Sequence, residues 1–371
     1  MKKQKKILIF VNSFYQLVVA VNLKNTLFCY DKVDLFITNF TPNCYKVYEK
    51  IRKNNIFNEV RYIKAYKISK NDKLTKKIII GLKMKMSKKA EKFNLPVDLK
   101  YDYDELLFYT IVPETLYLSH CINKNNKNFR CSRFEEGFVS YYRDIPISKE
   151  LNFVISDKIV KEKMKNYYFF ETDLAIVKHY NYNFKTIPKL DRSNVPFLND
   201  LKKIFNINKV TKIKEKYIFF EQWFHQDRND IDDLELVLRI SDIVGKDNLL
   251  VKLHPSTKED RFSKYGIKVS KNSDIPLEAL QLIDNYDDKI FITIYSGCII
   301  NQKILFDNNI KSYFLSNCYN IDMEGDFEAF LEVYSAKFDS DNIEFPKNLN
   351  SFYTSLKKGV KQERRKTNEK R

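Results

Sequence analysis

The chain has 371 residues, of which 44% are hydrophobic and 15% aromatic, so it can bury a large core and is not a disordered protein. Six scattered cysteines, with no CxxC pair and no histidine at zinc spacing, exclude a disulfide-stapled scaffold and a zinc module, and favour free thiols in a cytosolic protein. The formal net charge of +17 first suggests a nucleic-acid or anionic-membrane partner.

The positive charge is concentrated in two segments. Residues 61–100 contain 13 Lys/Arg and 3 Asp/Glu, and residues 357–371 contain 8 Lys/Arg and 2 Asp/Glu. These segments account for +10 and +6 of the total, which leaves the remainder close to neutral. The bulk of the chain is therefore a nearly neutral globular body with two basic appendages.

The N-terminus has some features of a secretory signal, because basic residues precede an apolar run. The run ends after Val11, and the polar residues Asn12, Ser13 and Gln16 come next, without a small-residue cleavage site. We therefore expect a first β-strand at Lys6–Val11. No apolar run reaches the roughly 18–20 residues of a spanning helix, so we expect a soluble or peripheral protein.

Short apolar runs then alternate with helical patterns along the first half of the chain. After the first strand we expect, in order, a helix at 15–27, a strand at 33–38, a helix at 43–53, a strand at 60–65, a long basic helix at 73–93, and strands at 106–112 and 129–134. This βαβ rhythm favours a parallel sheet covered by helices on both faces.

The second half begins after a weakly periodic stretch, 182–215, whose Pro188 and Pro196 suit a crossing between domains. The expected elements are a strand at 217–221, a helix at 230–244, a strand at 249–253, a helix at 276–283, a strand at 290–295 followed by a helix, and a strand at 312–315. Two doubly wound halves predict an α/β protein of GT-B-like architecture, with two Rossmann-type parallel-sheet domains facing a cleft. The expected boundaries are 1–200 for the N-terminal domain, 201–350 for the C-terminal domain and 351–371 for a basic tail.

Two glutamates and a glycine come directly after the predicted strand at 129–134. Adjacent carboxylates raise one another's pKa, so Glu135 or Glu136 could act as a general base near neutral pH. Gly137 permits a positive φ and a close approach of the backbone to a ligand. A solvated acidic pair in an ordinary turn is the alternative for these residues.

A histidine and a serine end two strands of the second series. Pro255 restricts His254 to extended conformations and aims its imidazole beyond the strand end, where it could donate to a phosphate or protonate a leaving group. Ser296 and Gly297 precede an expected helix, whose N-terminus would attract an anion. The alternatives are a histidine packed on its neighbours and a serine that only caps a helix.

A second acidic group comes after the first strand of the second series. It comprises Glu221, Gln222 and Asp227, with Trp223 and His225 among them. The tryptophan suits the face of a sugar or a base, or a domain interface.

Common phosphate-binding and hydrolase motifs are missing from the sequence, which has no Walker loop, GxGxxG, HExxH or GxSxG. One DxD triplet, Asp102–Asp104, precedes a predicted strand, whereas ligands bind where strands end. We therefore expect chemistry without a metal and without a cofactor.

The order of the motifs resembles that of a known family. The motifs are Asn12-Ser13-Phe14-Tyr15-Gln16, Glu135-Glu136-Gly137 with Ser140-Tyr141, Lys252-Leu253-His254-Pro255, Ile275-Pro276-Leu277-Glu278 and Ser296-Gly297. Together they resemble the bacterial sialyltransferases of lipooligosaccharide and capsule synthesis, glycosyltransferase family 52 and its polysialyltransferase relatives, over about residues 6–310. Two positions depart from the family pattern: the early loop has Ser13-Phe14-Tyr15-Gln16 in place of Thr-Pro-x-Gln, and Gly297 occupies the second position of the serine motif.

The resemblance implies an inverting, metal-independent enzyme that transfers sialic acid from CMP-sialic acid to a glycan hydroxyl of lipooligosaccharide or surface polysaccharide. The N-terminal domain would be the acceptor side and the C-terminal domain would bind the nucleotide sugar. The implied roles are acid or phosphate ligand for His254, phosphate ligand for Ser296, and base for Glu135 or Glu136, with Asp227 in reserve. The other implied substrate-binding positions are Ser13, Gln16, Gly137, Pro255, Glu278 and Gly297.

The basic segments suggest where such an enzyme would work. Apolar residues recur at every fourth position from Leu74 to Ala90, so the helix at 73–93 could lie on an anionic membrane or cover the first sheet. The segment 357–371, expected to be disordered, could dock on the same lipids. We expect a cytoplasmic enzyme, peripheral at the inner face of the membrane, with a lipid-linked glycan as acceptor and no nucleic-acid partner. A homodimer remains open.

Other hypotheses also remain open. A related transferase could use another nucleotide sugar, and a cell-wall polyol-phosphate transferase could use similar strand-end histidine and serine groups. A basic nucleic-acid binder is the non-enzymatic alternative, although the charge lies in two separate segments and no RNP, KH or zinc-finger pattern accompanies it.

Overall fold

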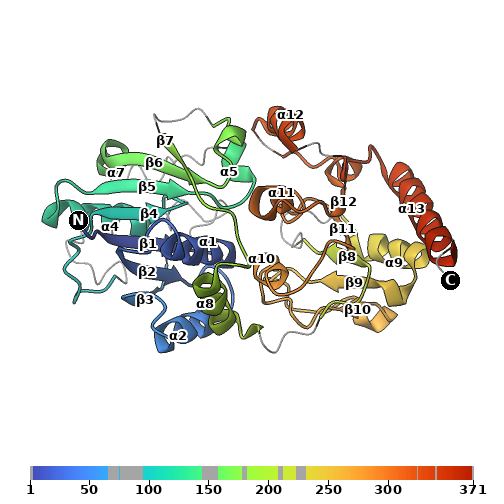
Figure 1. Ribbon diagram of the computed structural model, residues 1–371, viewed down its shortest axis with the longest axis horizontal. Coiled ribbons are helices and arrows are strands. Elements are labelled where there is room, and N and C mark those ends of the chain that lie inside the picture. The colour runs from blue at the N-terminus through green and yellow to red at the C-terminus, as the bar shows by residue number, and fades with distance from the viewer. Residues whose placement is uncertain are drawn as a thin grey trace. The chain divides into compact units, whose positions relative to one another are not determined.

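The chain forms two compact units, residues 1–207 and 208–371, each built around its own parallel β-sheet (Figure 1). The computed structural model describes residues 3–65, 75, 95–143, 158–177, 182–207, 212–222, 231–323, 325–338 and 341–369. The expected basic helix at 73–93 lies, apart from Thr75, outside the described residues.

The first unit contains a seven-stranded sheet in the order β3-β2-β1-β4-β5-β6-β7, with every neighbouring pair parallel. Its strands are β1 (Lys6–Val11), β2 (Lys32–Thr38), β3 (Val60–Ile63), β4 (Glu105–Phe108), β5 (Arg130–Phe134), β6 (Met164–Phe169) and β7 (Asn183–Thr186). The chain runs outward from β1 to β3 and then returns to the other side of β1 with β4. The sheet therefore has a switch point between β1 and β4, the place where open α/β sheets bind ligands.

Helices bury the faces of this first sheet. They are α1 (Phe14–Asn25), α2 (Cys44–Lys53), α4 (Pro113–Asn125), α5 (Val139–Tyr142), α7 (Lys158–Lys163) and α8 (Val195–Phe205). Helices α1 and α2 pack against α8, and α4 packs against α7. Adjacent strand residues point to opposite faces of the sheet, and Ile7 and Leu8 are both fully buried, so both faces are covered. After Lys6, β1 is accordingly apolar rather than alternating.

The second unit contains a six-stranded sheet in the order β10-β9-β8-β11-β12-β13, again with parallel pairs throughout. Its strands are β8 (Tyr217–Phe220), β9 (Leu249–Lys252), β10 (Lys268–Val269), β11 (Ile290–Thr293), β12 (Lys311–Phe314) and β13 (Ile343–Glu344). The switch point lies between β8 and β11. The prediction of two Rossmann-type parallel-sheet domains is confirmed.

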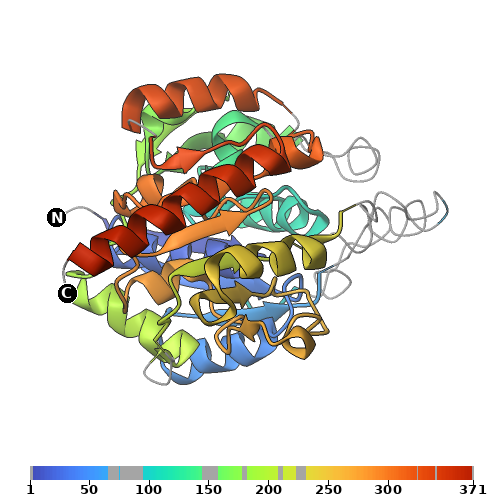
Figure 2. The same cartoon turned by 90° about the vertical axis from the view of Figure 1, so that its right-hand side faces the viewer.

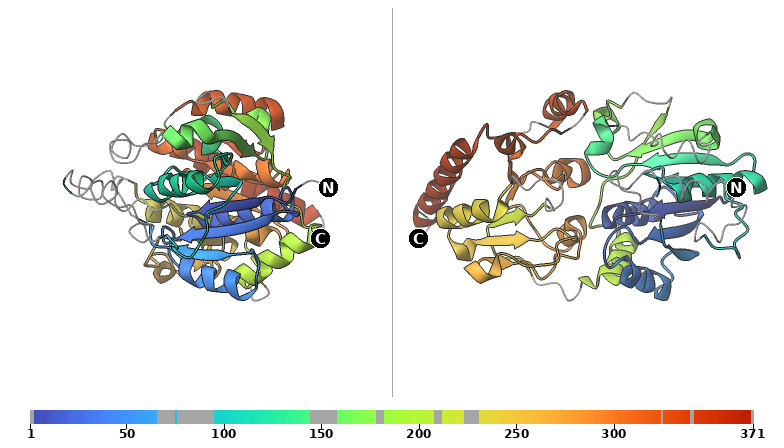
Figure 3. Two further views of the ribbon diagram at one scale, coloured as in Figure 1. Left: turned by 90° about the vertical axis from the view of Figure 1, so that its left-hand side faces the viewer. Right: turned by 180° about the vertical axis from the view of Figure 1, so that it is seen from behind.

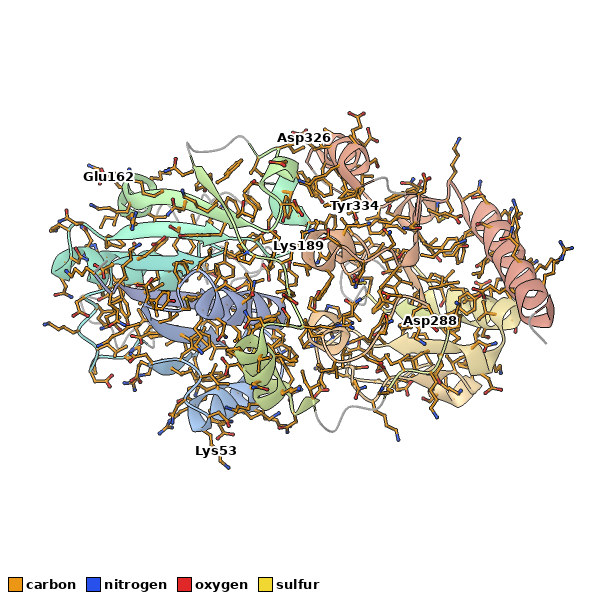
Figure 4. The ribbon with its side chains drawn as sticks, in the orientation of Figure 1. Lys53, Glu162, Lys189, Asp288, Asp326 and Tyr334 are labelled. Carbon is orange, nitrogen blue, oxygen red and sulfur yellow. The ribbon has the colours of Figure 1, made fainter. Side chains whose placement is uncertain are left out.

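The helices of the second unit are α9 (Asp233–Val244), α10 (Leu277–Gln281), α11 (Asn301–Phe306), α12 (Phe327–Phe338) and α13 (Leu349–Glu369). Helix α9 begins where the Asp232 carboxylate accepts the backbone N–H groups of Leu234 and Glu235, and it ends at Gly245, whose φ is 88°. Helix α12 is fixed through Tyr334, labelled in Figure 4, whose hydroxyl donates to the carbonyl oxygen of Ile300 at 3.1 Å.

The expectation of a disordered C-terminal tail is wrong, because the segment forms α13. Figures 2 and 3 show this helix running alongside α9. Phe352 and Leu356, one helical turn apart, are buried in the core of the second unit and anchor α13 there. Among the described residues, no helix is both long enough and apolar enough to cross a bilayer.

Most of the remaining expected strands and helices are present, including α1, α2, α9 and α10, and several strands and helices were not expected. The strands expected at 6–11, 33–38, 60–65, 106–112, 129–134, 217–221, 249–253, 290–295 and 312–315 are all present, with shifted ends. The stretch 182–215, expected to be only a crossing, contains β7 and α8, and no helix was expected where α4 lies. After β11, the expected helix does not begin at Ser296; a turn intervenes and α11 begins at Asn301.

Candidate functional site

The predicted site residues of the first unit lie just beyond strands near its switch point. Ser13 and Gln16 come after β1, and Glu135, Glu136 and Gly137 come after β5. Gly137 has a φ of 81°, so the backbone at this strand end requires the left-handed conformation that glycine adopts freely.

Ser13 joins the start of α1 to Glu136. Its hydroxyl oxygen accepts the backbone N–H of Gln16 at 3.1 Å and so caps the helix. The same side chain hydrogen-bonds the Glu136 carboxylate, and the Gln16 amide also lowers the pKa of that carboxyl. The Nε2 of Gln16 is buried and makes no hydrogen bond of normal geometry to the described residues. Three residues that the sequence predicted separately are thus brought together.

Glu136 keeps contact with solvent while its pKa is raised. Burial is the largest cause of the increase, and the nearby Ser13 hydroxyl and Gln16 amide oppose it. Its backbone N–H donates to the Ser140 hydroxyl at 2.7 Å, which fixes the turn. The Glu136 carboxylate is therefore partly exposed and held in place, and its pKa lies above that of an ordinary glutamate.

Glu135, by contrast, is fully buried with both of its oxygens occupied. Tyr15 donates to Oε1 at 2.6 Å, and the Tyr141 hydroxyl and, at 3.3 Å, the Phe170 N–H donate to Oε2. Burial raises its pKa to about 7, against the opposing effect of these hydrogen bonds. Glu135 is therefore a structural node between α1, β5 and β6.

Strand β5, which leads to the two glutamates, also contains a buried arginine. Arg133 is 1% exposed, and its guanidinium carbon is 6.0 Å from the centroid of the Tyr167 ring. Its charge lowers the pKa of Tyr109, which comes after β4, and of Tyr167, whereas burial raises both. Arg133 therefore acts on the tyrosines of the neighbouring strands.

In the second unit, His254 comes after β9 as predicted and is partly exposed. Its Nδ1 accepts the backbone N–H of Ser256 at 3.1 Å, so the proton of the neutral imidazole lies on Nε2. Burial lowers the pKa of His254, and Lys252 adds to that decrease, while Glu221 opposes it. The imidazole is therefore neutral at pH 7 and presents an N–H donor. Pro255 is exposed next to it.

Glu221 comes after β8 and contacts the loop that contains His254. It accepts the His254 backbone N–H at 3.0 Å, the Thr257 hydroxyl at 2.6 Å and the Arg261 guanidinium at 3.1 Å. The sequence grouped Glu221 with Gln222 and Asp227; Asp227, like Trp223 and His225, lies outside the described residues.

A buried lysine stands two residues before the histidine. Lys252 is 7% exposed, and its Nζ donates to the carbonyl oxygen of Ser273 at 3.1 Å. Burial lowers its pKa to about 8, while the charges of Glu278 and Cys298 oppose that decrease. Burial also raises the pKa of Glu278, a predicted substrate residue that is 8% exposed on α10. Lys252 and Glu278 therefore form an electrostatic pair at the end of β9.

Ser296 and Gly297 lie in the turn after β11 rather than at a helix N-terminus. The Ser296 backbone N–H donates to the Thr293 hydroxyl at 3.1 Å, and its side-chain oxygen accepts the Cys298 N–H at 3.4 Å. Gly297 is not among the glycines with positive φ, and its carbonyl oxygen accepts the N–H of Asn301. The helix-dipole argument for an anion at this position is wrong, and what remains is a partly exposed hydroxyl at a strand end.

Similarity to known proteins is found at the level of the fold. No protein-family model and no curated protein sequence matches the chain. Among solved structures it is similar to the UDP-GlcNAc 2-epimerase from Methanocaldococcus jannaschii, with 14% identity and a TM-score of 0.52 over 96% of this chain and 92% of that one. The chain has a GT-B fold, with two Rossmann-type parallel-sheet domains.

Two further solved structures have lower scores. The UDP-GlcNAc 2-epimerase from Neisseria meningitidis, bound to UDP-GlcNAc, has 11% identity and a TM-score of 0.49 over 96% of this chain and 90% of that one. The wall teichoic acid polymerase TagF has 12% identity and a TM-score of 0.47 over 96% of this chain and 81% of that one.

Within this GT-B-like fold, sequence reasoning missed four residues that hold the predicted ones in place: Tyr15, Tyr141, Lys252 and Arg261. Tyr15, Tyr141 and Lys252 stand inside motifs that the sequence had singled out, so their position was a usable signal. Arg261 had none, because its two carboxylate partners come from β8 and α9, 40 and 28 residues earlier in the chain.

Proposed function

We propose that the protein is an inverting glycosyltransferase that moves sialic acid from CMP-sialic acid to a hydroxyl of a lipooligosaccharide or surface-polysaccharide glycan. The observation that carries the proposal is the tautomer of His254: because Nδ1 accepts a backbone N–H, the neutral ring presents Nε2–H beyond the end of β9. The order of the motifs and the glycosyltransferase-like fold support the same assignment.

The second unit would bind the donor phosphate. As CMP departs, negative charge develops on the phosphate oxygens, and preorganised donors and cations stabilise that charge best in a site with little water. His254 would donate Nε2–H to a phosphate oxygen, the Lys252 ammonium would add positive potential, and the Ser296 hydroxyl would contribute a further donor. Because these residues supply the charge, the proposal needs neither a metal nor a cofactor.

The first unit would supply the base. The acceptor oxygen forms a bond to the anomeric carbon on the face opposite the phosphate, the bond from that carbon to the phosphate oxygen breaks, and its electron pair leaves with CMP. The hydroxyl proton of the acceptor passes to the base. One displacement through an oxocarbenium-like state inverts the anomeric configuration.

Glu136 is the proposed base, and Glu135 is its support. A general base needs solvent access, a pKa near the working pH and a free oxygen. Glu136 is partly exposed with a raised pKa, whereas both Glu135 oxygens accept hydrogen bonds from tyrosine hydroxyls. Asp227 remains the reserve candidate.

The experiment that tests the proposal is nucleotide release. The full chain is incubated with CMP-sialic acid, a panel of UDP-sugars, or CDP-glycerol, each with a mixture of glycan acceptors, and the free nucleotide is quantified. Release of CMP from CMP-sialic acid, with a sialylated product of inverted configuration, is expected. Release only from UDP-sugars, or only from CDP-glycerol, would overturn the donor assignment in favour of another transferase. No release, together with tight nucleic-acid binding, would favour a nucleic-acid binder.

We further propose that the acceptor is lipid-linked and that α13 lies against an anionic bilayer. One face of this helix forms a shallow groove of exposed polar and cationic side chains: Thr354, Lys357, Lys358, Lys361, Gln362 and Arg365. Glu363, an acidic residue in the same turns of α13, does not line this groove. Tyr217 and Lys216 of the second unit contact its carboxylate at 3.1 and 3.2 Å. The charged side chains of this groove are therefore all cationic and complement a surface of lipid phosphates.

A further inference from the structure

The Glu221 carboxylate accepts several hydrogen bonds from the loop between β9 and β10. Its side chain has no solvent exposure. Oε2 accepts the His254 backbone N–H at 3.0 Å and the Thr257 hydroxyl at 2.6 Å, and Oε1 accepts Nη2 of Arg261 at 3.1 Å. Both ends of the segment 254–261 are thus bonded to one carboxylate.

Arg261 extends the connection to the next helix. Its Nη2 also donates to both carboxylate oxygens of Asp233, at 2.8 and 3.0 Å. Asp233 opens α9, and its side chain is 3% exposed. A single nitrogen therefore joins β8, through Glu221, to α9, through Asp233, and the loop lies between them.

We propose that Glu221 and Arg261 are positioning residues, which hold the loop 254–261 so that the imidazole of His254 meets the donor phosphate through Nε2. The inference rests on the proposed role of His254 in transfer. In this proposal Glu221 supports His254 and does not contact the donor, because each oxygen of its carboxylate already accepts hydrogen bonds from the loop.

The negative charge of Glu221 also acts on the imidazole itself. Among the described residues, the charged groups that act on His254 are Glu221, which raises its pKa, and Lys252, which lowers it. Removing only the charge of Glu221 should therefore lower the pKa of His254 further. A loop that has merely come loose would instead move that pKa up, toward the solvent value of about 6.5.

Three variants and one control separate these contributions. Glu221→Gln keeps an oxygen for the loop but turns an N–H₂ group toward Arg261, which breaks the ion pair. Arg261→Gln removes the cation. Arg261→Lys keeps a cation with one nitrogen, and in the wild type one nitrogen, Nη2, makes all three bonds to Glu221 and Asp233. The matched control is Glu235→Gln, because Glu235 pairs with Arg239 at 3.2 Å on the exposed side of α9, with both side chains more than half exposed.

Two measurements on the full chain test the proposal. The chain has four histidines, so the imidazole titration of His254 can be followed by NMR with ¹⁵N-labelled histidine and assigned with His254→Gln. In Glu221→Gln we expect the midpoint to fall by about half a pH unit or more and the kcat for CMP release to fall at least about tenfold, with the donor KM changed less than about threefold. Arg261→Gln should lose turnover similarly, Arg261→Lys should recover most of it, and Glu235→Gln should match the wild type.

The proposal is overturned if Glu221→Gln leaves the His254 midpoint unchanged and lowers kcat less than about twofold, even if the melting temperature falls. That result would make the ion pair a stabilising contact only. The two proposals fail separately: absence of CMP release by the wild type refutes the proposed donor, whereas the His254 titration reports on Glu221 without any substrate.

Discussion

Glu135 and Glu136 are neighbours in sequence with opposite surroundings. The first carboxylate points into the core, where Tyr15 and Tyr141 donate to it, and the second lies beside Ser13 at the partly exposed start of α1. Backbone alternation at the end of a strand is sufficient to separate them. One is therefore suited to holding the strand end together and the other to exchanging a proton.

Replacing the proposed base should abolish most of the transfer. Glu136→Gln keeps the shape of the side chain but cannot take a proton, so we expect transfer to an acceptor to fall by roughly 10²–10⁴-fold. Glu135→Gln, which alters a supporting residue, should cost less than about tenfold. Initial rates of sialylated product, measured beside the melting temperature of each variant, test this difference. A larger loss in Glu135→Gln than in Glu136→Gln would exchange the two roles.

The raised pKa of Glu135 predicts how stability depends on pH. Its pKa is about 7 in the folded chain and 4.5 in the reference state, so folding favours the protonated form. The associated stability is fully present below about pH 4.5 and is lost as the pH rises through 7, by about 3 kcal/mol at most, since one pKa unit corresponds to about 1.4 kcal/mol. In Glu135→Gln the free energy of unfolding should decline less between pH 5 and 8 than in the wild type. Urea unfolding at each pH measures it, with Glu235→Gln as a control that should match the wild type.

The site could be predicted from sequence as a set of positions but not as a set of roles. His254, Ser296 and the glutamate pair were found because each follows a predicted strand, and strand ends are where α/β sheets bind ligands. Tyr15, whose hydroxyl donates to Oε1 of Glu135, is 120 residues earlier in the chain, and local patterns cannot reveal such a contact. The order of the motifs therefore predicted Glu135 and Glu136 equally, and only their burial distinguishes them.

At the scale of elements, α13 has two faces with different functions. Phe352 and Leu356 are buried and attach the helix to the second unit, while Lys357, Lys361 and Arg365 are exposed along the opposite side. The first and the last of these three cations are eight positions apart, about 12 Å along the helix. The helix can therefore present a row of charges without leaving the core.

Neutralising the exposed face of α13 should weaken binding to anionic vesicles. The triple variant Lys357→Gln, Lys361→Gln, Arg365→Gln should bind phosphatidylglycerol-containing vesicles about 100-fold more weakly, since each cation near such a surface contributes about 1 kcal/mol. Cosedimentation at low salt measures the partition coefficient.

The matched control for α13 neutralises three exposed lysines elsewhere: Lys53, Lys203 and Lys264. It changes the net charge equally and should retain most of the binding. Equal loss in both triple variants would show that net charge, not α13, governs adsorption.

The sequence predicted strands better than helices. β1, β2 and β11 are short runs of mostly buried and mostly apolar residues, a pattern that a parallel sheet imposes because both of its faces are covered. Helix α8 was missed although Asn194 caps it by accepting the Phe197 N–H at 3.1 Å and Pro196 opens it, because these residues also suit a linker. Helix α13 was missed because its many cations obscured the Phe352–Leu356 pair.

At the scale of the whole molecule, each unit has its own sheet, core and switch point. The residues proposed to act on the donor phosphate, His254 and Lys252, belong to the second unit, and the proposed base, Glu136, belongs to the first. Binding of the nucleotide and removal of the acceptor proton are therefore assigned to different sheets.

This division predicts the thermal response to CMP. A ligand that binds only the folded state stabilises it by about 2.7 kcal/mol at a hundred times its Kd. CMP should therefore raise the melting temperature of the wild type and of Glu136→Gln equally, and should do so much less in His254→Ala, at the same ligand concentration. Differential scanning fluorimetry measures the shift. Loss of the CMP response in Glu136→Gln would contradict the assignment of nucleotide binding to the second unit alone.

Burial of Lys252 has a consequence for the proton balance of binding. Its pKa of about 8 means that part of the population is uncharged near neutral pH, and His254 is mostly uncharged there as well. A phosphate dianion bound beside both groups would favour their protonated forms, so the complex would take up protons from the buffer. Affinity for the nucleotide would then weaken as the solution becomes alkaline, and the enzyme would release both its product and the captured protons more readily.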